Sequence, residues 1–269
     1  MSARVDIFIP YWGDFCLLQE TVRSVFNQTS DAWHLTILDD HYPSEEAYHY
    51  YRAHPDQRLT YIRHAKNIGI THNFNTALQR ATAEYCMIVG CDDRLLPHYV
   101  ETALAHIGQA DFYQPGVQVI DADGHSYLPL ADRVKRWLQP KKSGLYRGER
   151  LAASLCHGNW LYFPSILWRT STLKRYSFDA SYTILEDVVL ELAMIADGAT
   201  LYFDTAETFQ YRRFAESLSS KEKGKHGVRF AEERQVYRHA ASVFQAHGWR
   251  RAARAARLRL TSRIHQTIS

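Results

Sequence analysis

A regular alternation of short apolar runs and amphipathic segments over the first hundred residues constrains the fold more than any other feature of this sequence. The apolar runs lie at 5–9, 35–38, 59–62 and 85–89, segments with apolar residues at helical spacing lie at 14–26 and 70–81, and a polar helix is expected around 44–54. Strands that alternate with helices in this way form right-handed crossovers and a largely parallel sheet. We therefore expect an α/β protein with a Rossmann-like, mostly parallel central sheet and helices on both faces.

Polar residues stand where the predicted strands end. Pro10-Tyr11, Asp39-Asp40, His64–Asn67 and Asp92-Asp93 come at the ends of successive apolar runs. The carboxyl ends of parallel strands meet at one edge of the sheet, and ligands of such sheets bind there. The sequence therefore predicts a binding site at this edge.

The second half of the chain is less regular. Strands are expected at 112–120, 201–203 and 208–211, a helix at 185–195 that opens with Glu186-Asp187, and two further helices from Val228 onward. The stretch from Arg133 to Arg150 is basic and contains glycine and proline. This composition favours a mobile loop.

Composition excludes several classes of protein. The chain has 269 residues, 46% of them hydrophobic and 23% charged, with 32 Lys and Arg against 29 Asp and Glu. It is therefore not disordered, collagen-like or of low complexity. The sequence has no run of about 18 apolar residues, which a membrane-spanning helix requires. The apolar N-terminal stretch, interrupted at Pro10, is too short for a secretion signal, so we expect a cytoplasmic protein.

Basic residues concentrate in the last part of the chain. Residues 225–269 contain ten Lys and Arg but two Glu, and we expect a domain at 1–224 followed by basic helices at 225–269. Arg250, Arg254 and Arg257 share one helical face. Such a face is typical of a solvated helix, and the alternative is peripheral contact with an anionic membrane or a polyanionic acceptor. A nucleic acid is not an expected partner, because no nucleic-acid-binding module is recognisable.

The aspartate pairs indicate a specific chemistry. Two adjacent carboxylates at the mouth of a buried strand are costly unless a cation lies beside them. For Asp92-Asp93 the expected cation is Mn²⁺ or Mg²⁺, which prefers oxygen ligands and bridges phosphate oxygens. Each aspartate pair also has an ordinary structural explanation. Asp92-Asp93 could cap the helix that begins at Pro97, and Asp39-Asp40 could belong to a turn. Two acidic pairs on one sheet edge favour a ligand site.

These residues resemble the family-2 glycosyltransferases. The matching motifs, in order, are Val5–Tyr11, Ser24–Thr29, Leu38–Asp40, Lys66–Gly69, Gly90–Asp93 followed by Pro97, and Glu186-Asp187. The resemblance covers about residues 4–212 and is densest in the first hundred. It implies a GT-A-like fold and inverting transfer from a nucleoside-diphosphate sugar. Nucleotide-sugar binding would fall at about 1–110 and the acceptor side at about 111–224.

The resemblance assigns roles on the nucleotide side. Pro10 and Tyr11 would line the nucleotide pocket. Asp40 would accept a hydrogen bond from the base, typically uracil, which makes a UDP-sugar the expected donor. Lys66 and Asn67 would contact the nucleotide or its diphosphate, and their alternative role is that of an ordinary turn.

The same resemblance assigns the metal-binding and catalytic groups. Asp93 would bind the divalent metal, with Asp92 beside it facing the ribose or the donor sugar, and the metal would offset the charge of the departing diphosphate. Asp187, preceded by Glu186, would be the general base for the acceptor hydroxyl, a role worth roughly 10²–10⁴-fold in rate. Acidic residues are also common at helix starts, so position alone does not separate catalysis from helix stabilisation.

One departure from the family pattern lies at Phe214, where a histidine that helps bind metal or diphosphate is often present. Water could fill that position in the metal shell. Arg212 or Arg213 would instead neutralise the diphosphate by bidentate pairing. The alternative is that these arginines are a solvated pair at a strand end.

The segment from Gly158 to Ser165 is rich in aromatic residues. In the family this neighbourhood borders the acceptor site, and Trp160 and Tyr162 could form a platform for a sugar ring. Core packing is the alternative explanation for the same residues.

The sequence therefore predicts an inverting, metal-dependent glycosyltransferase whose acceptor is a hydroxyl of a glycan, a glycolipid or a protein. A sugar-nucleotide nucleotidyltransferase uses a similar sheet, but it usually has a glycine-rich loop after the first strand, where this chain has Pro10–Gly13 with one glycine. A non-catalytic nucleotide- or glycan-binding module is a third hypothesis, which Phe214 keeps open. No G-x-G-x-x-G follows the first strand, so a dinucleotide-dependent oxidoreductase is not expected.

Overall fold

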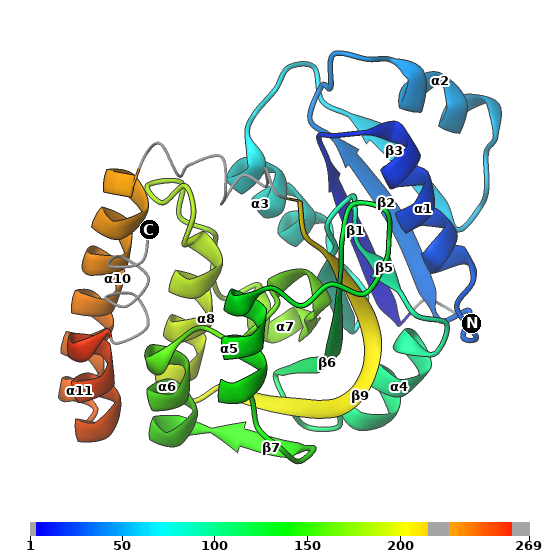
Figure 1. The fold of residues 1–269 in the computed structure, drawn as a ribbon. Coiled ribbons are helices and arrows are strands. Elements are labelled where there is room, and N and C mark those ends of the chain that lie inside the picture. The colour runs from blue at the N-terminus through cyan, green and yellow to red at the C-terminus, as the bar shows by residue number, and fades with distance from the viewer. Residues whose placement is uncertain (1–3, 215–225, 260–269) are drawn as a thin grey trace.

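The computed structural model describes residues 4–214 and 226–259, which form one mixed sheet with helices packed around it (Figure 1). The first part contains β1 (Val5–Tyr11), α1 (Phe15–Phe26), β2 (Trp33–Asp39), α2 (Glu46–Ala53), β3 (Leu59–Arg63), α3 (Ile70–Arg80), β4 (Tyr85–Ile88), β5 (Arg94–Leu95), α4 (Tyr99–His106) and β6 (Phe112–Ile120). The second part contains α5 (Leu130–Leu138), β7 (Gly144–Arg147), α6 (Gly148–His157), the short helix η1 (Phe163–Ser165), β8 (Leu167–Arg169), α7 (Thr170–Leu173), α8 (Glu186–Ala196), β9 (Thr200–Arg212), α10 (His226–Ala246) and α11 (Arg250–Leu258).

The sheet is parallel in its N-terminal half and mixed beyond it. The strand order is β3-β2-β1-β4-β8-β6-β9-β5, and β7 pairs with β9. β3, β2, β1 and β4 run parallel, which confirms the parallel sheet predicted for this half. Their register aligns Tyr11 with Asp39, and Asp39 with Arg63, so these strand ends lie at one level. The short antiparallel β8 then joins β4 to β6.

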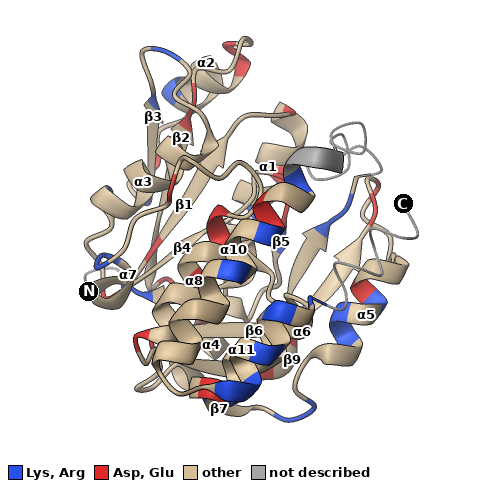
Figure 2. Ribbon diagram, turned by 90° about the vertical axis from the view of Figure 1, so that its left-hand side faces the viewer, with Lys and Arg blue, Asp and Glu red and all other residues tan. Residues whose placement is uncertain are grey.

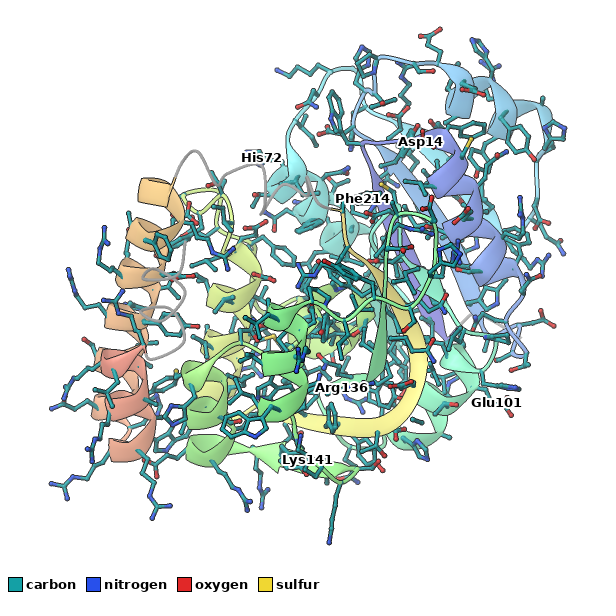
Figure 3. The ribbon with its side chains drawn as sticks, in the orientation of Figure 1. Asp14, His72, Glu101, Arg136, Lys141 and Phe214 are labelled. Carbon is teal, nitrogen blue, oxygen red and sulfur yellow. The ribbon has the colours of Figure 1, made fainter. Side chains whose placement is uncertain are left out.

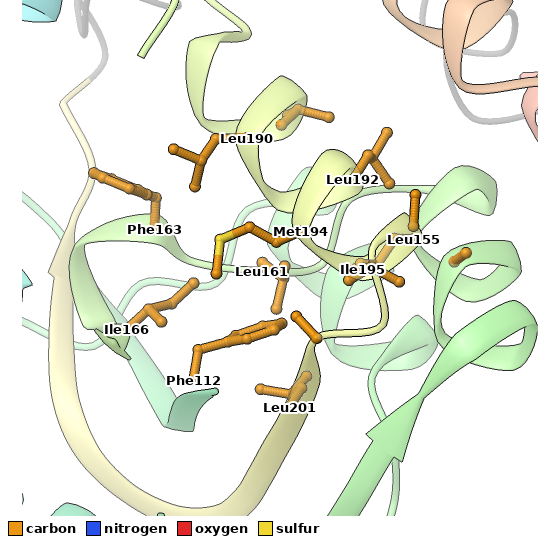
Figure 4. Packing of buried hydrophobic residues seen from close by; sticks show 14 of the residues in the cluster. Phe112, Leu155, Leu161, Phe163, Ile166, Leu190, Leu192, Met194, Ile195 and Leu201 are labelled. Atoms are coloured by element: carbon orange, nitrogen blue, oxygen red, sulfur yellow. The ribbon is translucent and has the colours of Figure 1, made fainter. Parts of the chain in front are cut away.

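Alternate residues of β1 belong to two hydrophobic cores, one on each face of the sheet. Ile7 and Ile9 lie in a core with residues of α1, α2 and α4, whereas Phe8 lies in a core with residues of α3, α6, α8, α10 and α11. Figure 4 shows the second core, in which Phe112 of the sheet packs with Met194 of α8. Because side chains of a strand alternate between faces, the two cores confirm the predicted helices on both sides.

The strands predicted at 201–203 and 208–211 are one continuous strand, β9, which curves strongly (Figure 1). A register shift against β6 accompanies the curve. At the shift, β6 passes so close to β9 that a Cβ on Gly116 would lie 2.8 Å from the carbonyl oxygen of Thr205. The prediction of two strands is wrong, because the polar residues between them mark a bend and not an end of pairing.

The basic stretch from Arg133 to Arg150, predicted as a mobile loop, is largely regular secondary structure. It contains most of α5, all of β7 and the start of α6. β7 pairs antiparallel with the start of β9, and α5 is anchored by the buried side chain of Asp132. Gly148 has a φ of 60° at the junction with α6. It therefore marks a turn between two ordered elements.

The C-terminal helices α10 and α11 pack on α8 and α6 (Figure 1). Phe244 of α10 is fully buried, and its ring stacks on Trp249 at a centroid distance of 5.7 Å. α11 buries Ala252, Ala253, Ala255 and Ala256 and exposes Arg250, Arg254 and Arg257. The basic face predicted for this helix is thus solvent-exposed, and its apolar face belongs to the core. No helix within residues 4–214 and 226–259 is long and apolar enough to cross a membrane.

Replacing Phe244 by alanine tests whether the C-terminal helices belong to the cooperative core. Removing a fully buried phenylalanine leaves a cavity, and we expect Phe244→Ala to lower the free energy of unfolding by about 3–5 kcal/mol. Arg254→Ala, on the exposed face of α11, should change it by less than about 0.5 kcal/mol. Urea unfolding followed by circular dichroism measures both; a loss below about 1 kcal/mol for Phe244→Ala would contradict the shared core.

Candidate active site

An aromatic wall borders the nucleotide side of the predicted site. Pro10 and Tyr11 are the last residues of β1, both buried, and the Tyr11 hydroxyl has no hydrogen-bond partner among the described residues. The Tyr11 ring lies 5.4 Å from that of Tyr42, and the half-exposed Trp12 packs edge-on against Tyr42 at 5.3 Å. An exposed tryptophan at this edge is suited to stack on a base or a sugar. Sequence reasoning missed Trp12 and Tyr42, for which the only signal is an aromatic residue beside a strand end.

Asp39 and Asp40 have different partners. Asp39 is fully buried and accepts the main-chain N–H of Tyr42 at 2.8 Å, so it supports the local fold. Asp40 accepts the main-chain N–H groups of Ile68 at 2.7 Å and Gly69 at 2.9 Å, one on each carboxylate oxygen. Each oxygen has a second lone pair, so Asp40 retains acceptor capacity toward a base.

The contacts of Asp40 fix the turn that leads into α3. Gly69, directly before α3, has a φ of 84°, a conformation that favours glycine. Lys66 and Asn67 are exposed on this turn. The structure thus brings Asp40, Lys66 and Asn67 together at one edge, and their contact with a nucleotide stays a prediction.

Asp92 and Asp93 form a like-charge pair at the end of β4. Asp93 is buried, and its Oδ1 accepts the main-chain N–H of Arg212 at 2.9 Å. Burial, and then the charge of Asp92, hold the pKa of Asp93 well above its usual range, and burial also raises the pKa of Asp92. A Cβ on Gly90 would lie 2.6 Å from Asp93 Oδ2 and 2.9 Å from Asp92 Oδ1. Two such carboxylates packed over a glycine fit a hard divalent cation.

Arg212 does not have the role predicted for it. Its guanidinium is buried and donates to the carboxylate of Glu20 at 2.7 Å. It also donates to the carbonyl oxygens of Asp92 at 2.8 Å and Ala122 at 2.6 Å. The structure contradicts both the prediction of diphosphate neutralisation by Arg212 and its alternative as a solvated group. Arg212 instead joins the end of β9 to the turns that follow β4 and β6.

A second acidic cluster lies in the turn after β6. Ligand atoms of Asp121, Asp123 and His125 all lie within 4.8 Å of one another. The Asp121 carboxylate accepts the main-chain N–H groups of Asp123 at 3.0 Å and His125 at 2.8 Å. Such contacts are typical of an aspartate-stabilised turn and explain the cluster without a metal. It is also more exposed than Asp93, and it offers a control position for the predicted metal site.

Glu186 and Asp187 open α8, as predicted. Asp187 is half-buried; burial raises its pKa, whereas the N–H of Val188 and the charge of Lys135 lower it. Glu186 is more deeply buried, with one carboxylate oxygen unpaired among the described residues, and burial raises its pKa to about 7. Asp187, which is more accessible and faces a cation, is the better placed of the two to accept a proton.

A residue of the C-terminal helix α10 fixes the approach to α8. Glu232 accepts hydrogen bonds from the N–H and the hydroxyl of Thr183, at 2.9 and 2.7 Å, and from the N–H of Ile184 at 3.1 Å. These contacts hold the residues directly before Glu186 and Asp187. Sequence reasoning missed Glu232, since only the folded chain brings it to this loop.

Three further charged groups connect Asp93 to Asp187. Arg213 pairs with buried Asp132 through two hydrogen bonds, at 3.0 and 2.9 Å, and its charge lowers the pKa of Asp93. Lys135 lies one turn further along α5. Burial, and then the charge of Arg213, lower its pKa to about 8, whereas Asp132 and Asp187 act to raise it. The charges of Arg213 and Lys135 thus act on the carboxylates at the sheet edge and at the start of α8, respectively. Asp132 and Lys135 were not predicted, because α5 was expected to be largely a loop.

Trp160 and Tyr162 are buried and do not form the predicted sugar platform. Trp160 is fully buried, and its Nε1–H donates to the hydroxyl of Ser154 at 3.0 Å. The hydroxyl of Tyr162 donates to Asp132 at 2.8 Å, and the ammonium of Lys135 lies 4.3 Å from its ring centre. Core packing, the alternative explanation, is therefore correct for Trp160, whereas Tyr162 supports the charged groups of α5.

Phe214 follows Arg213 just beyond the end of β9, near the carboxyl edge of the sheet (Figure 3). Its side chain is half-buried. The remainder of the motif in which it was singled out, residues 215–219, lies outside the described residues.

The aspartate pair thus lies at the carboxyl edge of a crossover sheet, which is where the ligands of α/β sheets bind. Residues 6–170 match the model of Glycosyl transferase family 2, and the chain belongs to this family of sugar-transferring enzymes. An uncharacterized glycosyltransferase of Methanocaldococcus jannaschii is 24% identical over 198 residues, 71% of this chain and 63% of that protein. This chain thus spans less than two thirds of the archaeal relative. The Bacillus subtilis protein EpsE, provisionally named a glycosyltransferase, is 24% identical over 234 residues, 81% of this chain and 79% of that protein.

The fold is similar to solved structures of S. aureus TarS. The structure of TarS residues 1–349 matches with a TM-score of 0.68 and 16% identity, covering 96% of this chain and 71% of that chain. The same TarS segment in complex with UDP-GlcNAc gives a TM-score of 0.68 and 15% identity, covering 91% of this chain and 66% of that chain. This likeness confirms the predicted GT-A-like α/β fold.

Glu186→Gln tests the electrostatic environment at the start of α8. The pKa of Glu186 rises on folding, to about 7, so its contribution to stability is fully present below about pH 4.5 and is lost as the pH rises through about 7. Between about pH 4.5 and 8 we expect the free energy of unfolding of the wild type to fall by about 3 kcal/mol relative to Glu186→Gln. Urea unfolding across this range measures the difference, with exposed Glu46→Gln as the control. Equal pH dependence in wild type and Glu186→Gln would refute the burial effect.

Proposed function

We propose that this protein is an inverting glycosyltransferase that moves a sugar from a nucleoside-diphosphate sugar, with a UDP-sugar as the first candidate, to a hydroxyl of a glycan, a glycolipid or a protein. The observation that carries the proposal is the adjacent pair Asp92–Asp93 at the end of β4, whose carboxylates both pack over Gly90, with Asp93 buried and held by the N–H of Arg212. Inversion requires a charge that offsets the leaving diphosphate and a base on the opposite side of the anomeric carbon. The aspartate pair and Asp187 would supply these two functions.

Asp93 and Asp92 would hold a divalent cation, Mn²⁺ or Mg²⁺. Their carboxylates are the kind of ligand that these ions prefer, and burial, which raises the pKa of both groups, disfavours their charge unless a cation lies beside them. When bound, the cation supplies Lewis-acid stabilisation of the negative charge on the leaving diphosphate. The N–H of Arg212 orients Asp93, and Gly90 leaves the space that both carboxylates need.

Asp187 would accept the proton of the acceptor hydroxyl. Its position in the first turn of α8 and the charge of Lys135 favour the ionised form against the cost of burial. Glu232 holds the residues directly before α8, which orients the carboxylate. Glu186, buried beside it, would act as a positioning residue.

Pro10, Tyr11 and Asp40 would line the nucleotide pocket, with Lys66 and Asn67 near the diphosphate. The exposed ring of Trp12, which packs against Tyr42 at the end of β1, supports stacking of a base there. TarS, which shares this fold, was solved with UDP-GlcNAc, and this sugar nucleotide is the donor to test first.

The exposed arginines of α11 would attract an anionic membrane or a polyanionic acceptor through charge alone. The alanines of this helix face the core, so the helix has no free apolar face to insert into a membrane. A contact of this kind weakens as salt is added, because surface charges are screened beyond about 10 Å at moderate ionic strength.

Asp93→Asn and Asp187→Asn separate donor binding from base catalysis. We expect Asp93→Asn to lose the Mn²⁺-dependent thermal shift with UDP-GlcNAc, since the shift reports bound donor. Asp187→Asn should keep the shift but lower kcat for transfer or donor hydrolysis by roughly 10²–10⁴-fold. A donor panel of UDP-, GDP- and dTDP-sugars, screened with and without Mn²⁺, identifies the nucleotide.

Asp121→Asn, in the second acidic cluster, is the matched control and should retain both the shift and the rate. If Asp121→Asn lost the Mn²⁺-dependent thermal shift and Asp93→Asn kept it, the metal site would be assigned to the turn after β6. Full turnover in Asp187→Asn would show that Asp187 is not the general base.

Lys135→Met tests the electrostatic support of the proposed base. The charge of Lys135 lowers the pKa of Asp187, so its removal raises that pKa and the base is ionised over a narrower range. The acid limb of the kcat profile should therefore move to higher pH, with a rate loss several-fold larger near about pH 6 than near about pH 8. A uniform loss at all pH values would point to a packing defect instead.

A further inference from the structure

The helix α5 exposes most of its large apolar side chains, which an ordinary surface helix buries. Asp132 is buried, and the half-buried Lys135 donates to the carbonyl oxygen of Leu161 at 2.7 Å. Leu138 packs against the core, but the exposed fractions are 65% for Leu130, 38% for Val134 and 75% for Trp137. Residues spaced by four and three positions share one helical face, so these three form a stripe. A surface helix normally turns such a stripe toward the core.

The stripe continues into the segment that precedes α5. Tyr127 is 48% exposed and Leu128 is 40% exposed. Of the nine large apolar side chains that are exposed in residues 4–214 and 226–259, five therefore lie between 127 and 137. We call these five residues, Tyr127, Leu128, Leu130, Val134 and Trp137, the α5 patch. Exposed apolar residues gathered in this way on one helix and the segment before it indicate an interaction surface.

Positive charge flanks the α5 patch. Arg133, Arg136, Lys141 and Lys142 are all exposed, and Figure 3 shows Arg136 and Lys141 at the end of α5 and just beyond it. Between residues 129 and 147 the only acidic residue is Asp132. Asp132 is buried and paired with Arg213, and Arg136 pairs with Glu207 of β9 at 2.5 Å. The cations that remain for an anionic surface are therefore Arg133, Lys141 and Lys142.

We propose that the α5 patch docks the protein on the surface of a lipid bilayer that contains anionic headgroups. Aliphatic side chains with an exposed tryptophan, bordered by Arg and Lys, are the composition that lies in a membrane interface. The cations pair with anionic headgroups, and their long side chains reach the headgroup level while the apolar stripe enters the acyl boundary.

This surface differs from the basic face of α11. Figure 2 shows the arginines of α11 toward the viewer and α5 at the right-hand side. α11 has charge without a free apolar stripe, whereas α5 has both. The inner side of α5 contributes Asp132 and Lys135 to the candidate site, so docking through the outer side would place the acceptor side of that site next to the membrane. The docking itself does not depend on the proposed sugar transfer.

Co-sedimentation with lipid vesicles tests the proposal. We expect the full chain to bind vesicles of phosphatidylcholine with about 30% phosphatidylglycerol, and to bind pure phosphatidylcholine far less. The triple variant Leu130→Gln, Val134→Gln, Trp137→Gln should lose about 10²-fold in vesicle binding, since three apolar side chains no longer enter the interface. Brominated acyl chains should quench part of the tryptophan fluorescence of the wild type, and Trp137→Phe should remove that quenching.

Two matched variants separate the surfaces. Tyr50→Gln changes an exposed apolar side chain on α2, far from α5 (Figure 1), and should bind vesicles as the wild type does. The triple variant Arg250→Gln, Arg254→Gln, Arg257→Gln removes the basic face of α11 and should retain most binding.

Three results would overturn the proposal. The first is no binding of the wild type to anionic vesicles at about 0.1 M salt, and the second is equal binding of the wild type and the α5 triple variant. The third is a wild type that is dimeric by sedimentation equilibrium while the α5 triple variant is monomeric, which would assign the α5 patch to a second copy of the chain. Thermal unfolding of each variant checks that these exposed substitutions leave the fold intact.

Discussion

Asp93 holds together three parts of the structure that are distant in sequence. Its carboxylate accepts the main-chain N–H of Arg212, and its carbonyl oxygen accepts the hydroxyl of Thr21 at 2.7 Å. The first bond ties the turn after β4 to the end of β9, and the second ties it to α1. The same carboxylate stands beside Asp92 in a buried setting that disfavours its charge. A group suited to hold a ligand is therefore also part of the framework, and a cation would relieve the cost of its burial.

Opposite charges act on several carboxylates of the site. Arg213 pairs with Asp132 and lowers the pKa of Asp93, and the charge of Lys135 lowers the pKa of Asp187. An opposite neighbour is a condition under which buried ions are tolerated. Truncating one member would leave its neighbours uncompensated, so the effects of such changes should couple strongly and should not add.

The sheet edge could be predicted because its signals are local. The Asp14 cap of α1, the apolar run of β4 and the turn at Gly69 are each specified by a few adjacent residues. The remainder of the candidate site could not be predicted from the sequence, because it depends on contacts between residues that are distant in the chain. Arg212 has a strand-end position that suits diphosphate binding, and only the folded chain shows Glu20 and three carbonyl oxygens occupying its donors. The pattern of α5 predicts an amphipathic helix but does not say which face turns inward.

The contact of Glu232 with the loop before α8 has a consequence for synthesis. The ribosome synthesises the sheet edge, the aspartate pair and Asp187 well before residue 232. Until Glu232 has been synthesised and α10 has docked, the N–H groups of Thr183 and Ile184 lack this acceptor, and the start of α8 is not held. The two sides of the candidate site are therefore completed at different stages of synthesis, first the aspartate pair at the sheet edge and last the carboxylates that open α8.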